Sequence, residues 1–243
     1  MTLINKQRMG LSKMKQYFGG ILAATMLLSG CAQNDDDGQQ KNKKEDVKTA
    51  QHNQQKNTKH QVTHKNGVTK VDGIILVNKS VSISKDYNKG EDPVAKAQLN
   101  KMIDDGRKAG LNIIYRSGFR SYAEQTQLYN GYVQRDGKKA ADKYSAAPGT
   151  SEHQTGLAFD VGTNPSNSDF KTSFGKTAEG KWLAKNAYKY GFILRYPKGK
   201  ENITGYQYEP WHFRYVGKKD AKAIHDKNTT LEEYLNYGYS KSK

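Results

Sequence analysis

The chain has 243 residues, a formal net charge of +16 at pH 7 and a mean hydropathy of −0.94. This length accommodates a targeting segment, a linker and one domain with a sizeable core, and so polar a chain is expected to be soluble. Its single cysteine excludes an intrachain disulfide. The positive charge favours an anionic partner, which leaves nucleic acid, anionic lipid and an acidic extracellular polymer as alternatives.

Residues 1–30 have the pattern of an export signal. Four basic residues and no acidic residue precede an apolar run over residues 17–28, which is too short to span a bilayer. The run ends in Leu28-Ser29-Gly30-Cys31, which resembles the lipobox of bacterial lipoproteins. The resemblance implies a signal peptide cleaved before Cys31 and lipidation of that residue. The protein would then be extracytoplasmic, anchored to the outer face of the bacterial cell membrane; the alternative is an uncleaved anchor with an unmodified thiol.

Residues 31–66 are predicted to be a disordered polar tether that begins at the lipidated cysteine. Their apolar residues are isolated, so the segment cannot bury enough surface to offset the entropy of ordering it. His52, His60 and His64 have no regular spacing, which favours incidental polar residues over a metal-binding tract. The folded domain is expected over residues 67–243.

Within this domain, strand and helix patterns alternate. Strands are predicted over residues 74–77, 111–115, 157–161 and 192–196, and from residue 211. Helices are predicted over residues 93–109, 121–134, 138–144, 178–190 and 219–226, and from residue 230. Asp92 and a capping box from Ser121 to Glu124 mark two of the helix starts. Val94, Ala97 and Leu99 are assigned to the buried face of the first helix.

The segment 151–161 carries the first candidate metal ligands. Its second half alternates, so Phe159 and Val161 are expected on one face of a strand and Asp160 on the other. His153 precedes Gly156, which can turn the chain sharply, so that the imidazole folds back beside the carboxylate. This arrangement would provide a metal ion with one nitrogen ligand and one oxygen ligand. The alternative is a solvent-facing aspartate with a capping or surface histidine.

Two further motifs carry polar side chains suited to hydrolysis. Glu209 and His212 lie at the start of a predicted strand, and suit a pair in which the histidine binds a metal and the glutamate acts as a base. Ordinary polar residues at a strand start are the alternative. Arg116 and Arg120 precede a helix N-terminus, a place suited to an anion or a developing oxyanion. On spacing alone, the two arginines are better interpreted as donors of surface salt bridges.

Together, three separated blocks look like the signature of the VanY-type zinc carboxypeptidases. They are Ser117-Gly118-Phe119-Arg120-Ser121-Tyr122 with Gln125, Ser151-x-His153-x-x-Gly156-x-Ala158-x-Asp160, and Glu209-x-Trp211-His212. The likeness covers roughly residues 70–237 and departs only at Phe119, where the family often has tyrosine. It implies an α+β fold with a small antiparallel sheet, helices packed around it and a zinc site in a cleft on the sheet, as in hedgehog and DD-peptidase folds.

The resemblance also implies roles for individual residues. His153, Asp160 and His212 would bind one Zn²⁺ ion, and Glu209 would take a proton from water and deliver it to the leaving amine. Arg120 would steady the carbonyl oxygen as it becomes anionic. Contacts to the substrate are assigned to Arg120, Gln125, Ser151 and Trp211.

The implied activity is removal of the C-terminal D-alanine from peptidoglycan stem peptides, at a D-Ala-D-Ala bond or an LD bond. The partners would be the stem peptide, the membrane through the lipid anchor, and anionic wall polymers. No nucleic-acid motif accompanies the scattered lysines, so nucleic acid is not expected as a partner. The alternatives are an endopeptidase acting within the stem peptide or cross-bridge, and a non-catalytic wall-binding lipoprotein.

Overall fold

A computed structural model describes residues 59–239 of the protein. The predicted signal peptide, the predicted lipidation site Cys31 and the predicted tether as far as residue 58 lie outside the described residues. Within residues 59–239, no helix is both long enough and apolar enough to cross a membrane.

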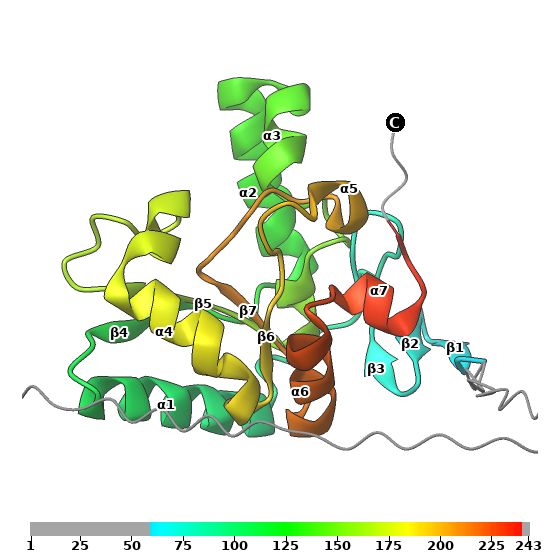
Figure 1. The fold of residues 1–243 in the computed structure, drawn as a ribbon. Helices are drawn as coiled ribbons and strands as arrows, with labels where there is room; N and C mark the ends of the chain where they lie inside the picture. The colour runs from blue at the N-terminus through cyan, green and yellow to red at the C-terminus, as the bar shows by residue number, and fades with distance from the viewer. Residues whose placement is uncertain (1–58, 240–243) are drawn as a thin grey trace, which may run out of the picture. The chain divides into compact units, whose positions relative to one another are not determined.

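Four antiparallel strands form the central sheet (Figure 1). Their spatial order is β4 (Ile113–Ser117), β5 (Ala158–Thr163), β7 (His212–Tyr215) and β6 (Phe192–Leu194). Phe159 is paired with Phe213 across β5 and β7, and the next pair in register is Asp160 with His212. Directly opposed residues share a face of a sheet. The two phenylalanines therefore face the core, and Asp160 and His212 face the other way.

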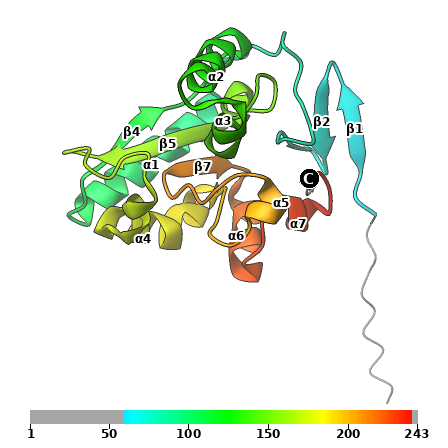
Figure 2. The same cartoon turned by 90° about the horizontal axis from the view of Figure 1, so that it is seen from above.

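Helices cover this sheet unequally. The α-helices are α1 (Pro93–Lys108), α2 (Tyr122–Asp136), α3 (Lys138–Tyr144), α4 (Ala178–Asn186), α5 (Glu201–Thr204), α6 (Lys218–Lys227) and α7 (Leu231–Leu235). The 3₁₀ turns are η1 (Glu152–Thr155), η2 (Thr172–Lys176) and η3 (Ala187–Tyr190). In Figures 1 and 2, α1 lies along one side of the sheet, whereas α2 and α3 project from the other side. The predicted α+β fold is confirmed.

The main core lies between the sheet, α1 and α4. Leu99, Met102 and Leu183 from these helices pack with Phe159 and Phe213, and all five are fully buried. Burying such side chains stabilises a fold by about 1.5–3 kcal/mol each. The core thus fixes the sheet from one side and leaves its polar face to a cleft.

Local signals set the helix starts as predicted. The Asp92 side chain accepts a hydrogen bond from the amide of Ala95, and Ser121 and Glu124 form the capping box of α2. The predicted buried face of α1 was wrong in its first turn, where Val94 is 58% exposed. Ala95, rather than Val94 or Ala97, is in line with the other buried residues of α1 at helical spacing.

A second, smaller sheet precedes α1. It is an antiparallel meander of β1 (Val62–Lys65), β2 (Val68–Val71) and β3 (Ile74–Ile75). β1 lies within the last residues of the predicted tether, so regular structure begins before residue 67. The reason is the two-residue turn Asn66-Gly67, in which both residues have positive φ, a strong hairpin signal.

Gly156 is the turn residue before β5, and its substitution tests whether the close backbone packing at this turn is required. Its φ is +72°, and a Cβ there would lie 2.0 Å from the carbonyl oxygen of Gly90. We expect Gly156→Ala to reduce the free energy of unfolding by about 3 kcal/mol or more, because the clash adds to the strain of a left-handed alanine. Gly110→Ala is the matched control, since Gly110 has φ +79° and open space around it. This control should cost only about 1–2 kcal/mol in denaturant unfolding. Equal losses of unfolding free energy in the two variants would show that the approach of the Gly90 carbonyl oxygen to Gly156 has no effect.

Candidate metal centre and cleft

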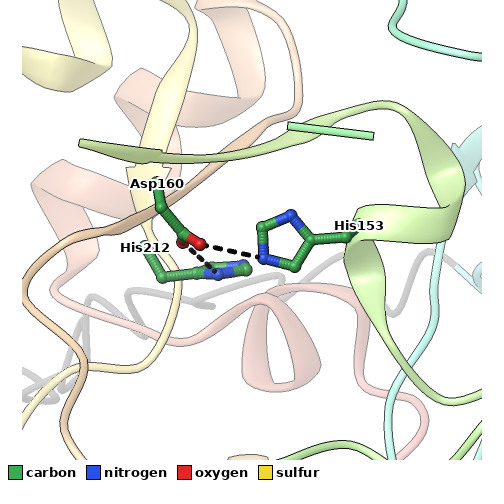
Figure 3. A group of neighbouring side chains, drawn as sticks. All are labelled: His153, Asp160 and His212. Atoms are coloured by element: carbon green, nitrogen blue, oxygen red, sulfur yellow. Dashed lines mark hydrogen bonds and ion pairs between the residues drawn. The ribbon is translucent and has the colours of Figure 1, made fainter. Parts of the chain in front are cut away.

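Three side chains from three segments converge on the polar face of the sheet (Figure 3). Asp160 on β5 and His212 on β7 are opposite each other in register, and His153 comes from η1 just before β5. His212 Nδ1 lies 3.1 Å from Asp160 Oδ1, and His153 Nε2 lies 3.3 Å from Asp160 Oδ2. Donor atoms of all three residues lie within 4.8 Å of one another. The structure thus brings together the three predicted metal ligands.

The two imidazoles present different nitrogens to the centre. His153 Nδ1 is 2.7 Å from the carbonyl oxygen of Gly118, so this nitrogen donates and Nε2 keeps its lone pair. His212 faces Asp160 with Nδ1 instead, and its Nε2 points away. The rings lie edge to face with their centroids 4.9 Å apart. Each imidazole therefore has one nitrogen available to a cation.

This donor set fits a catalytic zinc ion. Two imidazoles and one carboxylate are typical zinc ligands, and three protein ligands leave a coordination position open. All three residues are at most 6% exposed. Although burial alone would raise the pKa of Asp160, the two histidines hold it well below its ordinary value. A buried carboxylate that stays ionised between two imidazoles is suited to a divalent cation.

Glu209 lines the same cleft next to the predicted ligands. Its backbone amide donates to Tyr196 O, and its carbonyl oxygen accepts from the amide of His212. Burial raises the pKa of its carboxyl group to about 8; the nearby Asp160 also raises it, and His212 opposes the shift. A carboxylate with so high a pKa is a much stronger base than one in water.

Arg116 lies on β4 and Arg120 in the loop that follows it, and the two have different surroundings. Arg120 lines the cleft, and its Nη1 donates to Gln125 Oε1 at 2.9 Å. Gln125 is itself fixed, because its Nε2 donates to the carbonyl of Ala146 at 2.6 Å. Arg116 instead pairs with Asp169. The salt-bridge interpretation therefore holds for Arg116, while Arg120 keeps a guanidinium facing the cleft.

The cleft has a volume of about 510 Å³ and extends beyond the metal ligands. The predicted substrate contacts Ser151 and Trp211 line it, as do Arg120 and Gln125. A stripe on one face of α2 continues the lining, and it consists of Gln125, Leu128, Tyr132 and Arg135. At 1.5 Å per helical residue, this stripe runs for about 15 Å.

Sequence reasoning missed a group of buried ions behind the centre. Glu152, Arg195 and Arg214 are each at most 1% exposed, and both arginines donate to Glu152 Oε1, at 2.8 and 2.6 Å. The only signal in the sequence was arginine within apolar strand patterns, at positions 195 and 214.

Comparisons with known proteins agree with this geometry. A family model described as VanY, D-alanyl-D-alanine carboxypeptidase, matches residues 88–218. Bacillus subtilis YodJ is 41% identical over 199 residues, which cover 70% of this chain and 73% of that protein. The crystal structure of the L,D-carboxypeptidase DacB from Streptococcus pneumoniae is 49% identical, with a TM-score of 0.69, over 75% of this chain and 98% of that one. A Zn(II) complex of the vancomycin-resistance D,D-pentapeptidase VanY is 36% identical, with a TM-score of 0.59, over 67% of this chain and 98% of that one.

Proton release should accompany zinc binding. Burial alone would lower the pKa of His212, but its contacts with Asp160 and Glu152 raise it to about 9, so the metal-free protein is protonated there at pH 7. A ligand nitrogen must lose that proton, and we expect about one proton per zinc at pH 7 with affinity rising as pH approaches 9. Calorimetry in two buffers of different ionisation enthalpy measures this release. Glu209→Gln removes the cleft carboxyl group whose pKa of about 8 would also allow it to release a proton, so release in that variant reports on His212. Zinc binding without proton release at pH 7 would contradict the assignment.

Proposed function

Because the chain belongs to the VanY family of D-alanyl-D-alanine carboxypeptidases, as its motifs predicted, we propose that it removes the C-terminal D-alanine from peptidoglycan stem peptides by hydrolysis. The observation that carries the proposal is one cleft in which Glu209 and Arg120 flank the ligand set of His153, Asp160 and His212.

The proposal favours the L,D bond, in which an L-centre precedes the terminal D-alanine. The chain is 49% identical to an L,D-carboxypeptidase structure and 36% identical to a D,D-pentapeptidase structure. The TM-scores, 0.69 and 0.59, follow the same order. A stem tetrapeptide is therefore the proposed substrate.

One zinc ion is proposed as the cofactor, held by His153, Asp160 and His212. Such an ion supplies Lewis acidity and lowers the pKa of bound water toward about 7. The donor set and burial of the three side chains support this choice, as does the zinc complex of the D,D-pentapeptidase relative.

Glu209 is proposed as the general base and then the general acid. Its raised pKa suits it to accept a proton from the attacking water and to return that proton to the amine of the leaving D-alanine. The hydrogen bonds of its backbone to Tyr196 and His212 hold it at the start of β7. Its position is thus tied to that of a metal ligand.

Arg120 is proposed to stabilise the negative charge that develops on the carbonyl oxygen. Gln125 accepts from its guanidinium and orients it, while Ser151 and Trp211 are proposed contacts for the substrate. The remaining stem residues would follow the stripe on α2. Its length of about 15 Å accommodates about four residues of extended peptide at roughly 3.3 Å each.

The proposed location is the outer face of the cell membrane, with a lipid on Cys31. The apolar run and the Leu28–Cys31 pattern support this, because both are typical of exported lipoproteins. Removing residues 1–30 takes four positive charges away and leaves 16 − 4 = +12. A chain of that charge is suited to a wall that contains anionic polymers.

Product analysis on defined peptides tests the function. The zinc-loaded protein should release free alanine from a stem tetrapeptide and much less from a pentapeptide, because the proposed bond follows an L-centre. Glu209→Gln is the negative control and should retain zinc while releasing no alanine. Release from the pentapeptide alone would shift the assignment to the D,D bond, and internal fragments would indicate an endopeptidase. Cleavage of neither peptide with zinc bound would contradict the proposal and favour wall binding.

Arg120→Ala tests the proposed role in charge stabilisation. Removing an oxyanion donor typically reduces turnover by about 10²–10³-fold, and we expect a loss of that order with zinc retained. Arg116→Ala is the matched control, because Arg116 lies four residues away on β4 and pairs with Asp169. Steady-state kinetics of both variants on the cleaved peptide provide the measurement. Wild-type turnover in Arg120→Ala would exclude the role.

A further inference from the structure

Two buried polar atoms behind the metal centre face each other without a hydrogen-bond partner. They are Nε2 of His212 and Oε2 of Glu152, which lie 3.6 Å apart. Buried polar groups in folded proteins are nearly always paired, because an unpaired one costs about 1–3 kcal/mol. A donor and an acceptor that face each other at 3.6 Å, with no other partner, indicate that each is the partner of the other.

The nitrogen of His212 that faces the centre determines which nitrogen carries the proton when a metal ion is bound. Nδ1 lies 3.1 Å from Asp160 Oδ1, so Nδ1 is the nitrogen available to a cation. An imidazole that binds a metal through Nδ1 is neutral and carries its proton on Nε2. The Nε2–H group then needs an acceptor in a buried environment. Glu152 Oε2 is in position to supply it.

Glu152 is held in place by fully buried partners. Its other oxygen, Oε1, accepts from Arg195 Nε at 2.8 Å and from Arg214 Nη1 at 2.6 Å. Arg195 is bound in turn by Glu232 of α7 through two hydrogen bonds of 2.9 and 2.6 Å. Two glutamates and two arginines balance in charge, and the two arginine contacts on Oε1 leave Oε2 directed toward His212.

We propose that Glu152 is a positioning residue of the metal centre, whose Oε2 accepts the Nε2–H of His212 and holds Nδ1 toward the ion. The inference rests on the proposed zinc site and goes beyond the ligands themselves. His153 has the corresponding support from a neutral group, the carbonyl of Gly118. The two ligands thus differ in support, since only His212 is backed by a charged carboxylate.

A carboxylate in this position has two consequences. It fixes the ring tautomer, and it makes the imidazole a stronger donor to the cation. Loss of such a partner typically weakens metal affinity by about 10–100-fold. The effect belongs to metal binding and does not require a substrate.

The test compares two variants of the same buried ion group. Glu152→Gln removes the charge that faces His212, and Glu232→Gln removes the other carboxylate, which binds Arg195 and does not contact His212. Both are expected to lower the melting temperature. Only Glu152→Gln should raise the zinc dissociation constant, by about 10–100-fold in chelator competition. It should also shift the absorption spectrum of the cobalt-substituted protein, which Glu232→Gln should leave unchanged.

Outcomes of this comparison separate positioning from general stability. Equal weakening of zinc binding in both variants, or no change in Glu152→Gln, would overturn the proposal. If Glu152→Gln does not fold, nitrogen NMR of the zinc-loaded wild-type protein decides. A slowly exchanging proton on His212 Nε2 supports the proposal, and a fast-exchanging one overturns it. Zinc binding is measured without peptide, so failure of the stem-peptide assay would leave this result intact.

Discussion

Arg195 and Arg214 have no exposure to solvent, and both form an ion pair with Glu152. Burying ions is costly, and removing one member of a buried pair typically destabilises a protein by about 3–5 kcal/mol. The surrounding structure is arranged to meet this requirement. Arg214 Nη2 donates to the carbonyl of Ile75 in the small sheet, and Arg195 binds Glu232 in α7. The small sheet and α7, which lie near the two ends of the described chain, therefore both contact the buried ions next to the metal centre.

The front of the centre depends on strand register. Asp160 and His212 are far apart in sequence but directly opposed in the β5–β7 ladder, while Phe159 and Phe213 form the adjacent pair on the core face. A slip of one residue would exchange these faces. Core packing thus selects the register, and the register places the ligands. Stability and chemistry depend here on the same pairing.

The sequence predicted well those features that depend on local signals. The capping box of α2, the turn at Gly156 and the alternation around Asp160 each lie within a few residues, so their geometry can be inferred from spacing. The three ligands were found because their motifs resemble a family. β1 was missed because the polar composition around it predicts disorder, and the Asn66-Gly67 turn of the hairpin was not recognised. Glu152 was missed because sequence spacing does not reveal which charged side chains a fold buries. Arg116 and Arg120 could not be distinguished from sequence because their partners, Asp169 and Gln125, are distant or local contacts that only the structure shows.

The different nitrogens presented by the two histidines have a mechanical consequence. Nδ1 of an imidazole is as many bonds from the backbone as an aspartate oxygen, whereas Nε2 is one bond farther. His212 and Asp160 thus extend equally short arms from neighbouring strands, and His153 reaches in on a longer arm from a turn. Asp160 and His212 both stand on the hydrogen-bonded β5–β7 pair, and the hydrophobic core packs against its other face. His153 stands on a 3₁₀ turn outside this pair of strands, so the sheet supplies the rigid part of the centre.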